Sequence, residues 1–87
     1  MKSVKDTISE RTKTHGDFTE LSKTSQMFKA VIQTRGMSTL TPDKLEALDM
    51  IVHKMARILH GDPNNSDHWH DIAGYASLIE KSCSENK

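Results

Sequence analysis

Cysteine is almost absent from this sequence, since only one of its 87 residues is a cysteine. A single thiol, Cys83, cannot form a disulfide within the chain, so a disulfide-stabilised secreted domain is excluded. No apolar run approaches the roughly 18 residues of a membrane-spanning helix, and the first residues lack the apolar segment of a signal peptide. We therefore expect a soluble, intracellular protein with no membrane partner.

Apolar residues are also scarce. They make up 34% of the chain, and the mean hydropathy is −0.63. Ordinary domains contain about 45–50% apolar residues, in a count that includes glycine. A chain of this length also buries a smaller share of its surface than a large domain does. We therefore expect one domain with a thin core, which gains further apolar contacts in a homo-oligomer.

The chain also has no excess of basic or acidic residues. Twelve basic residues balance twelve acidic residues, so the formal net charge is zero. Nucleic-acid binders usually carry a basic excess that neutralises phosphates. The composition therefore predicts neither DNA nor RNA as a partner.

Helical periodicity is the main positive signal. Asp17, with Glu20 three residues later, has the arrangement of a capping box, and Thr41 before Pro42 is typical of a helix start. The apolar spacing then predicts three main helices, over about residues 18–34, 41–60 and 66–83. No segment shows the alternation of a strand.

The N-terminal segment, residues 1–13, allows two interpretations. Ser3 can cap a short helix from Val4 to Lys13, but the threonines of this segment weaken it, and a loosely docked arm is equally compatible. Residues 84–87 are expected to fray. The predicted fold class is all-α: a single domain over residues 1–87, built as a small bundle of three main helices plus a short N-terminal helix or arm.

The middle helix has a wide apolar arc, which indicates a central helix packed on two sides. Its main seam is predicted to be Leu45, Leu48, Val52, Met55 and Leu59.

Tryptophan and glycine, which are rare in the chain, allow further predictions. Trp69 is expected in the core. Gly36 is expected to end a helix in the left-handed conformation. Gly74, inside a helix, costs about 1 kcal/mol relative to alanine. It therefore indicates a close neighbour, and a helix contact within or between subunits is favoured over a ligand.

A polar site is predicted in residues 59–76, or where this stretch meets the second His-Gly-Asp segment at residues 15–17. Histidines and aspartates gather in this stretch, but His68 and His70 point about 200° apart on a helix and cannot share one metal ion. A polar loop with helix-capping aspartates is therefore favoured over a metal site.

Carboxylates offer a second interpretation. Glu46 and Asp49 form an E-x-x-D on the middle helix, and Asp71 lies on the next one. Residues 68–75 are similar to the E-x-x-D helix of MazG-type nucleoside triphosphate pyrophosphohydrolases, in which facing acids hold Mg²⁺. His68, however, stands where that family has its glutamate, so this activity is kept as an alternative.

A phosphate-binding interpretation requires fewer assumptions. Lys54 and Arg57 lie one turn apart, and an arginine can bind a phosphate through two parallel hydrogen bonds. The start of the helix after Gly16 can also attract an anion. The competing interpretation, slightly favoured, is that both cations pair with acids such as Asp71 or Asp17.

Three segments together resemble a known family: residues 14–18, which contain His-Gly-Asp; residues 53–58, which contain K-x-A-R; and residues 67–76, which contain W-x-D-I-A-G-Y-A. The family consists of small phage and prophage proteins without an assigned activity. The resemblance implies a phage or prophage origin, expression in the cytoplasm of the bacterial host, and one site shared by the three segments. Its candidate residues are His15, Asp17, Lys54, Arg57, Asp71 and Tyr75.

Three functions follow as hypotheses. The favoured one is a non-catalytic module that binds a phosphate-bearing, nucleotide-like ligand or a host factor, as in the sequestration of a host defence signal. It requires neither a metal nor another cofactor. The alternatives are a Mg²⁺-dependent MazG-like pyrophosphohydrolase and a structural oligomer whose polar groups satisfy each other.

Overall fold

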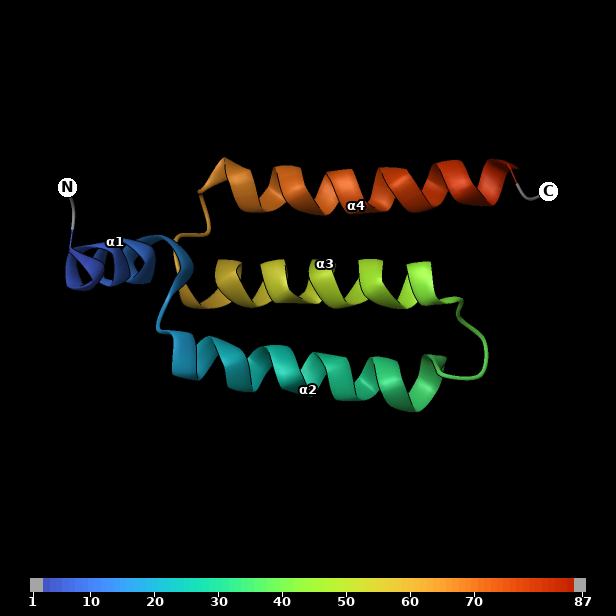
Figure 1. The fold of residues 1–87 in the computed structure, drawn as a ribbon, viewed down its shortest axis with the longest axis horizontal. Coiled ribbons are helices and arrows are strands. Elements are labelled where there is room, and N and C mark those ends of the chain that lie inside the picture. Colours follow the sequence, from blue (N-terminus) through green and yellow to red (C-terminus); the bar gives the residue numbers. More distant parts are fainter. Residues whose placement is uncertain (1–2, 86–87) are drawn as a thin grey trace.

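The computed structural model describes residues 3–85, and they form four α-helices without a strand (Figure 1). The predicted all-α bundle of three main helices and a shorter N-terminal helix is therefore confirmed. Within the N-terminal segment, the residues from Val4 onward are helical, and none of them is buried. The last helix includes Ser84 and Glu85 of the predicted tail, whereas residues 1–2 and 86–87 lie outside the described part. The helices are α1 (Val4–His15), α2 (Phe18–Gly36), α3 (Pro42–His60) and α4 (Ser66–Glu85).

Short polar side chains begin the helices, as the sequence predicted for α2. The Asp17 carboxylate accepts a hydrogen bond of 3.1 Å from the backbone N–H of Glu20. Ser3 does the same for Asp6 at the start of α1. The side chain of Asn65 accepts from the N–H of Asp67 in the first turn of α4. Each cap satisfies a donor that would otherwise lack a partner within the helix.

Gly36 does not have the predicted left-handed conformation. It is the last residue of α2, and among the described residues only Gly16 has a positive φ. The side chain of Leu40 folds back over Gly36, where a Cβ atom would lie 2.6 Å from Leu40 Cδ1. Gly36 therefore leaves room for this leucine at the turn between α2 and α3.

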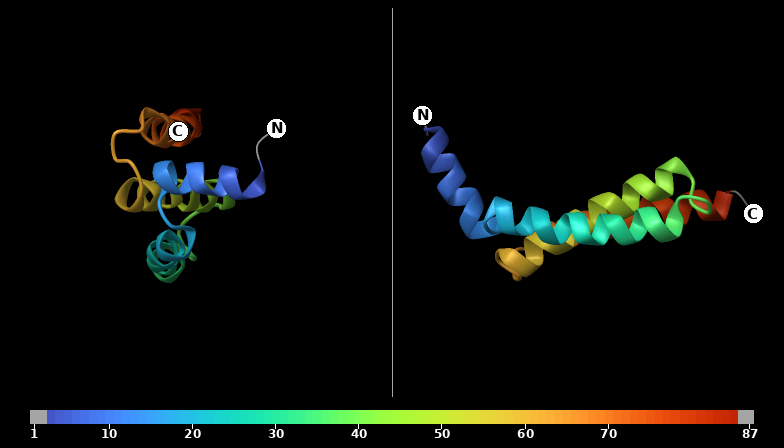
Figure 2. Two further views of the ribbon diagram at one scale, coloured as in Figure 1. Left: turned by 90° about the vertical axis from the view of Figure 1, so that its left-hand side faces the viewer. Right: turned by 90° about the horizontal axis from the view of Figure 1, so that it is seen from below.

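The three long helices lie side by side in one layer, with α3 in the middle (Figures 1 and 2). The prediction of a central helix packed on two sides is confirmed by this arrangement. α1 leaves the layer and extends to one side of it, and none of its residues is buried. No helix within residues 3–85 is long and apolar enough to cross a membrane.

The core is small. Among the described residues, the buried apolar side chains are Leu21, Ala47, Val52 and Ala56. Two of the four are alanines, which allow the neighbouring helices to approach α3 closely.

The predicted seam of α3 is only partly correct. Val52 is buried, but Leu48, Met55 and Leu59 are exposed. Because α2 and α4 lie on opposite sides of α3, each covers a narrow strip of the apolar arc, and the strip between them stays open.

The prediction that Trp69 lies in the core is wrong. Trp69 is 54% exposed, and its indole N–H donates to the Pro63 carbonyl at 2.9 Å. His68, the residue before Trp69 on α4, is buried in the core instead. No heavy atom of the described residues lies within 4 Å of the place where a Cβ on Gly74 would stand, so no helix contact within residues 3–85 explains this glycine.

Candidate functional site

The two His-Gly-Asp segments cross each other at their glycines. A Cβ on Gly16 would lie 2.3 Å from the carbonyl oxygen of His60, and a Cβ on Gly61 would lie 2.3 Å from the carbonyl oxygen of Thr14. The backbone N–H of Asp62 donates to the same Thr14 oxygen at 2.9 Å. This crossing fixes the end of α1 against the end of α3.

A pair of histidines lies directly beside this crossing. Nε2 of His68 is 3.2 Å from Nδ1 of His15 and 3.3 Å from the Thr14 carbonyl oxygen. Because the carbonyl can only accept, we place the hydrogen on Nε2 of His68, with Nδ1 of His15 as an unprotonated acceptor. His68 is 1% exposed, so this contact satisfies a ring nitrogen that has no access to water.

The electrostatics agree with a neutral His15. Burial, followed by the charge of Arg57 and smaller effects of His68, Arg11 and Lys54, lowers the pKa of His15 from 6.5 to about 4. The ring is therefore uncharged at neutral pH. Burial contributes most to this shift, and the positive charges near the ring add to it.

Arg57 is the centre of this positive charge. It is half-buried on α3, and among residues 3–85 no carboxylate forms an ion pair with it. Burial and the nearby Arg11 lower the pKa of Arg57, and only Asp71 opposes them. The pKa of His53, one turn earlier on α3, is lowered first by burial and then by Arg57, with smaller effects of lysines.

A pocket of about 410 Å³ opens between α1 and the layer, in front of Arg57. Its polar part contains two arginines and two histidines, and its walls include three large apolar side chains. Volumes of about 300–1,000 Å³ are typical of small-molecule sites. The lining residues are Ile8, Arg11, Thr12, His15, Gly16, Phe18, Leu21, His53 and Arg57.

Lys54, in contrast, already has a partner. Its ammonium lies 2.9 Å from the Asp71 carboxylate, and the two side chains are 12% and 42% exposed. This hydrogen bond is the main reason that the pKa of Asp71 is lowered. The predicted pairing of cations with acids is therefore confirmed for Lys54, whereas the described residues offer Arg57 no such partner.

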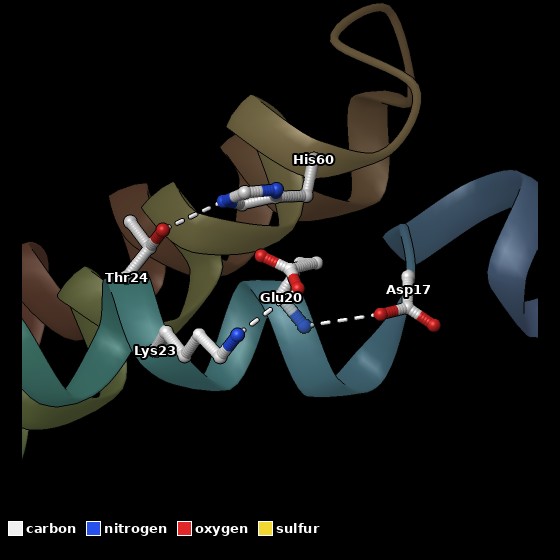
Figure 3. Close-up of polar contacts among 5 residues, drawn as sticks. All are labelled: Asp17, Glu20, Lys23, Thr24 and His60. Carbon is white, nitrogen blue, oxygen red and sulfur yellow. Dashed lines mark hydrogen bonds and ion pairs between the residues drawn. The ribbon is translucent and has the colours of Figure 1, made fainter.

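Asp17 and Tyr75 lie outside the pocket. The Asp17 carboxylate caps α2 by accepting a hydrogen bond from the N–H of Glu20 (Figure 3). His60, at the end of α3, hydrogen-bonds the Thr24 hydroxyl at 2.6 Å. Tyr75 lines an open hollow on α4 together with Asp71 and Gly74. Of the six candidates, the structure thus brings His15 and Arg57 together in the pocket, pairs Lys54 with Asp71 nearby, and separates the remaining two.

The carboxylates of the alternative interpretation are dispersed. Glu46 is exposed, Asp71 binds Lys54, and Oδ1 of Asp49 is buried without a hydrogen-bond partner. Within residues 3–85, no three side chains of histidine, cysteine, aspartate or glutamate are grouped to hold a metal ion.

Of the nine residues that line the pocket, only His15 and Arg57 were predicted as site residues, and three of the others matter most for its chemistry. Arg11 precedes His15 by four residues on α1, and His53 precedes Arg57 by four residues on α3. Residues four apart share one face of a helix, so this spacing was the signal that could have found both. Phe18 carried no such signal, because the turn at Gly16 decides where it points.

Comparison with known proteins gives a family but no function. The model of a family described as a domain of unknown function (DUF6378) matches residues 1–83. Searches of curated proteins and of solved structures find no significant match.

Proposed function

The chain belongs to the DUF6378 family, whose function is unknown, and from the geometry of its site we propose that it binds a small phosphate-bearing, nucleotide-like ligand without catalysing a reaction. The ligand occupies the pocket between α1 and the layer. Its phosphate binds Arg57 and Arg11, and its planar or apolar part lies against Phe18.

The observation that carries this proposal is the unpaired positive charge at the pocket. Arg57 is partly removed from water and lies near the positive charge of Arg11, and the negative charge of Asp71 opposes these two effects. A half-buried guanidinium without a carboxylate partner is costly, and a bound anion removes that cost. Phosphate supplies two oxygens in the geometry that the guanidinium favours.

The composition of the walls supports a ligand with more than a phosphate. Ile8, Phe18 and Leu21 line the same pocket as the two arginines. An inorganic anion would make no use of these side chains, whereas a base or another planar group would cover them. The sequence analysis assigned stacking to Tyr75; because Tyr75 lies in a separate hollow, we assign it to Phe18 instead.

The resemblance to small phage and prophage proteins gives this binding a biological setting. In the cytoplasm of an infected bacterium, capture of a nucleotide signal of host defence is one use of such a module. The presence of the Lys54–Asp71 pair agrees with a binding role, because it holds α3 against α4 and leaves Arg57 as the cation for the ligand.

The test is a nucleotide panel in two assays. We expect at least one mono- or dinucleotide to raise the melting temperature and to bind in calorimetry. Arg57→Gln should weaken that binding about 10- to 100-fold, as expected for loss of one charge-assisted hydrogen-bonding group. Arg35→Gln, at the far end of α2, is the matched control and should bind like the wild type.

Two results would contradict the proposal. If no nucleotide in the panel shifts the melting temperature, the ligand class is wrong. If a nucleoside triphosphate is hydrolysed with release of pyrophosphate, and EDTA stops the reaction, the chain is the Mg²⁺-dependent enzyme of the alternative hypothesis.

A further inference from the structure

One face of the three-helix layer is not covered by any described part of the chain. α1 extends to one side of the layer, where it meets the pocket near His53 and Arg57 (Figure 2). Domains are normally built from at least two packed layers, because a helix with apolar residues must cover them with another element. The uncovered side of this layer should therefore be polar if the chain works as a monomer.

The middle of this side is apolar instead. On α3, Leu48, Met55 and Leu59 follow one another at i, i+7 and i+11, so they point to the same side, and all three are exposed. Leu48 lies between two shallow grooves, one toward Val31 of α2 and the other toward Ala76 of α4.

The same face continues onto the outer helices. Trp69 precedes Ala76 by seven residues and so lies on the same side of α4; like Val31 on α2, it is largely exposed. We call Val31, Leu48, Met55, Leu59 and Trp69 the apolar face.

The exposed area is large for a chain of this mass. The accessible surface is 6434 Å². A compact monomer of 9.8 kDa exposes about 5,160 Å², so the excess is about 1,270 Å². The radius of gyration is 15.0 Å, against about 12 Å for a compact domain of this length. A standard protein interface takes about 800 Å² from each partner. The excess of the whole chain is therefore larger than the area that one partner contributes to such an interface.

We propose that the apolar face is the interface of a homodimer in which two layers stack face to face. A second copy is the occupant that fits, because four buried apolar side chains are a thin core for a domain of this size and another copy is present wherever the chain is made. A twofold axis between the layers brings the same residues from both copies together. Both ligand pockets then remain on the outer sides, so dimerisation does not depend on the proposed ligand.

The experiment is sedimentation velocity and light scattering over a range of protein concentrations. We expect a mass of about twice 9.8 kDa at high concentration. The emission of Trp69, the only tryptophan, should shift to shorter wavelength as the dimer forms and its ring leaves water. This fluorescence change is measured on the wild type, so it does not depend on the folding of any variant.

Two leucines provide a matched pair of variants. Leu59 is 64% exposed on the apolar face, and Leu78 is 65% exposed beside Tyr75 and Asp71 on the opposite side. Leu59→Lys should raise the dissociation constant at least tenfold, whereas Leu78→Lys should leave it unchanged. A wild-type mass of 9.8 kDa at every concentration, or dissociation by Leu78→Lys alone, would overturn the proposal.

Discussion

Replacing glycine by alanine at three positions gives a sharp test of the crossing between the two His-Gly-Asp segments. Gly16 has φ 89° and ψ 175°, a region that is nearly restricted to glycine. An alanine there is strained by about 1–3 kcal/mol. Its Cβ would also lie 2.3 Å from the His60 carbonyl oxygen, a backbone atom that cannot rotate away.

The expected magnitude follows from these contributions. Separation of the two segments removes the hydrogen bond between Asp62 and Thr14, worth about 0.5–1.5 kcal/mol. Together with the strain, Gly16→Ala should lower the free energy of unfolding by about 3–4 kcal/mol, a large part of the roughly 5–15 kcal/mol of a typical domain. A Cβ on Gly61 would lie equally close to a backbone atom, 2.3 Å from the Thr14 carbonyl oxygen, but Gly61 has a negative φ, so we expect a smaller loss of about 2 kcal/mol for Gly61→Ala.

Gly74→Ala is the control. Nothing lies within 4 Å of its Cβ position, and the residue is inside α4, so alanine should stabilise the chain by about 1 kcal/mol. The assay is urea unfolding followed by circular dichroism at one fixed protein concentration. A Gly16→Ala variant within about 0.5 kcal/mol of the wild type would refute the crossing as described.

Three further results are expected. Because the pKa of His15 is about 4 when folded and 6.5 when unfolded, the folded state binds fewer protons between these values. The loss of the His15 contribution should therefore lower the free energy of unfolding as the pH drops from 6.5 to 4, by about 1–2 kcal/mol once solvent screening is allowed for. Urea unfolding of His15→Asn should show a smaller fall over this range, and the fall that remains includes the contribution of His53, whose pKa is also lowered. Asp71→Asn should lower the melting temperature by leaving the mostly buried ammonium of Lys54 without its carboxylate, and adding Lys54→Met should restore most of the loss; equal melting temperatures for the wild type and Asp71→Asn would contradict the contact. Trp69→Ala, measured where the chain is monomeric, should cost about 1–2 kcal/mol, because a loss of roughly 3–5 kcal/mol is expected only for a buried tryptophan.

Most of the fold could be predicted from rules that involve only residues close together in the sequence. The positions of Asp17 and Pro42 predicted where two helices begin, since capping depends on a few neighbouring residues. The wide apolar arc of α3 predicted its central place. Which strip of that arc is buried depends on where α2 and α4 lie, and this is why Leu59 and Trp69 were assigned to the core incorrectly. One step along a helix turns a side chain by about 100°, enough to exchange His68 for Trp69.

The candidate site was predictable to a smaller degree. Arg57 and His15 were found because they lie in motifs, and their proximity followed from the two His-Gly-Asp segments. The charge around them was not predictable from the sequence. Arg11 lines the same pocket as His15 and Arg57 because α1 is a helix that ends at Gly16. Lys54 is not available to a ligand because its ammonium binds the Asp71 carboxylate. Both facts depend on the relative placement of whole helices.

The order in which the chain folds follows from its topology. α2 packs on α3 and α3 packs on α4, so neighbours in sequence are also neighbours in space and these contacts close short loops. The contact between His15 and His68 joins residues 53 positions apart, and it requires α3 and α4 to be in place first. We therefore expect the three-helix layer to form rapidly and α1 to dock in a later step. That step would complete the pocket, so ligand binding would begin only after α1 has docked.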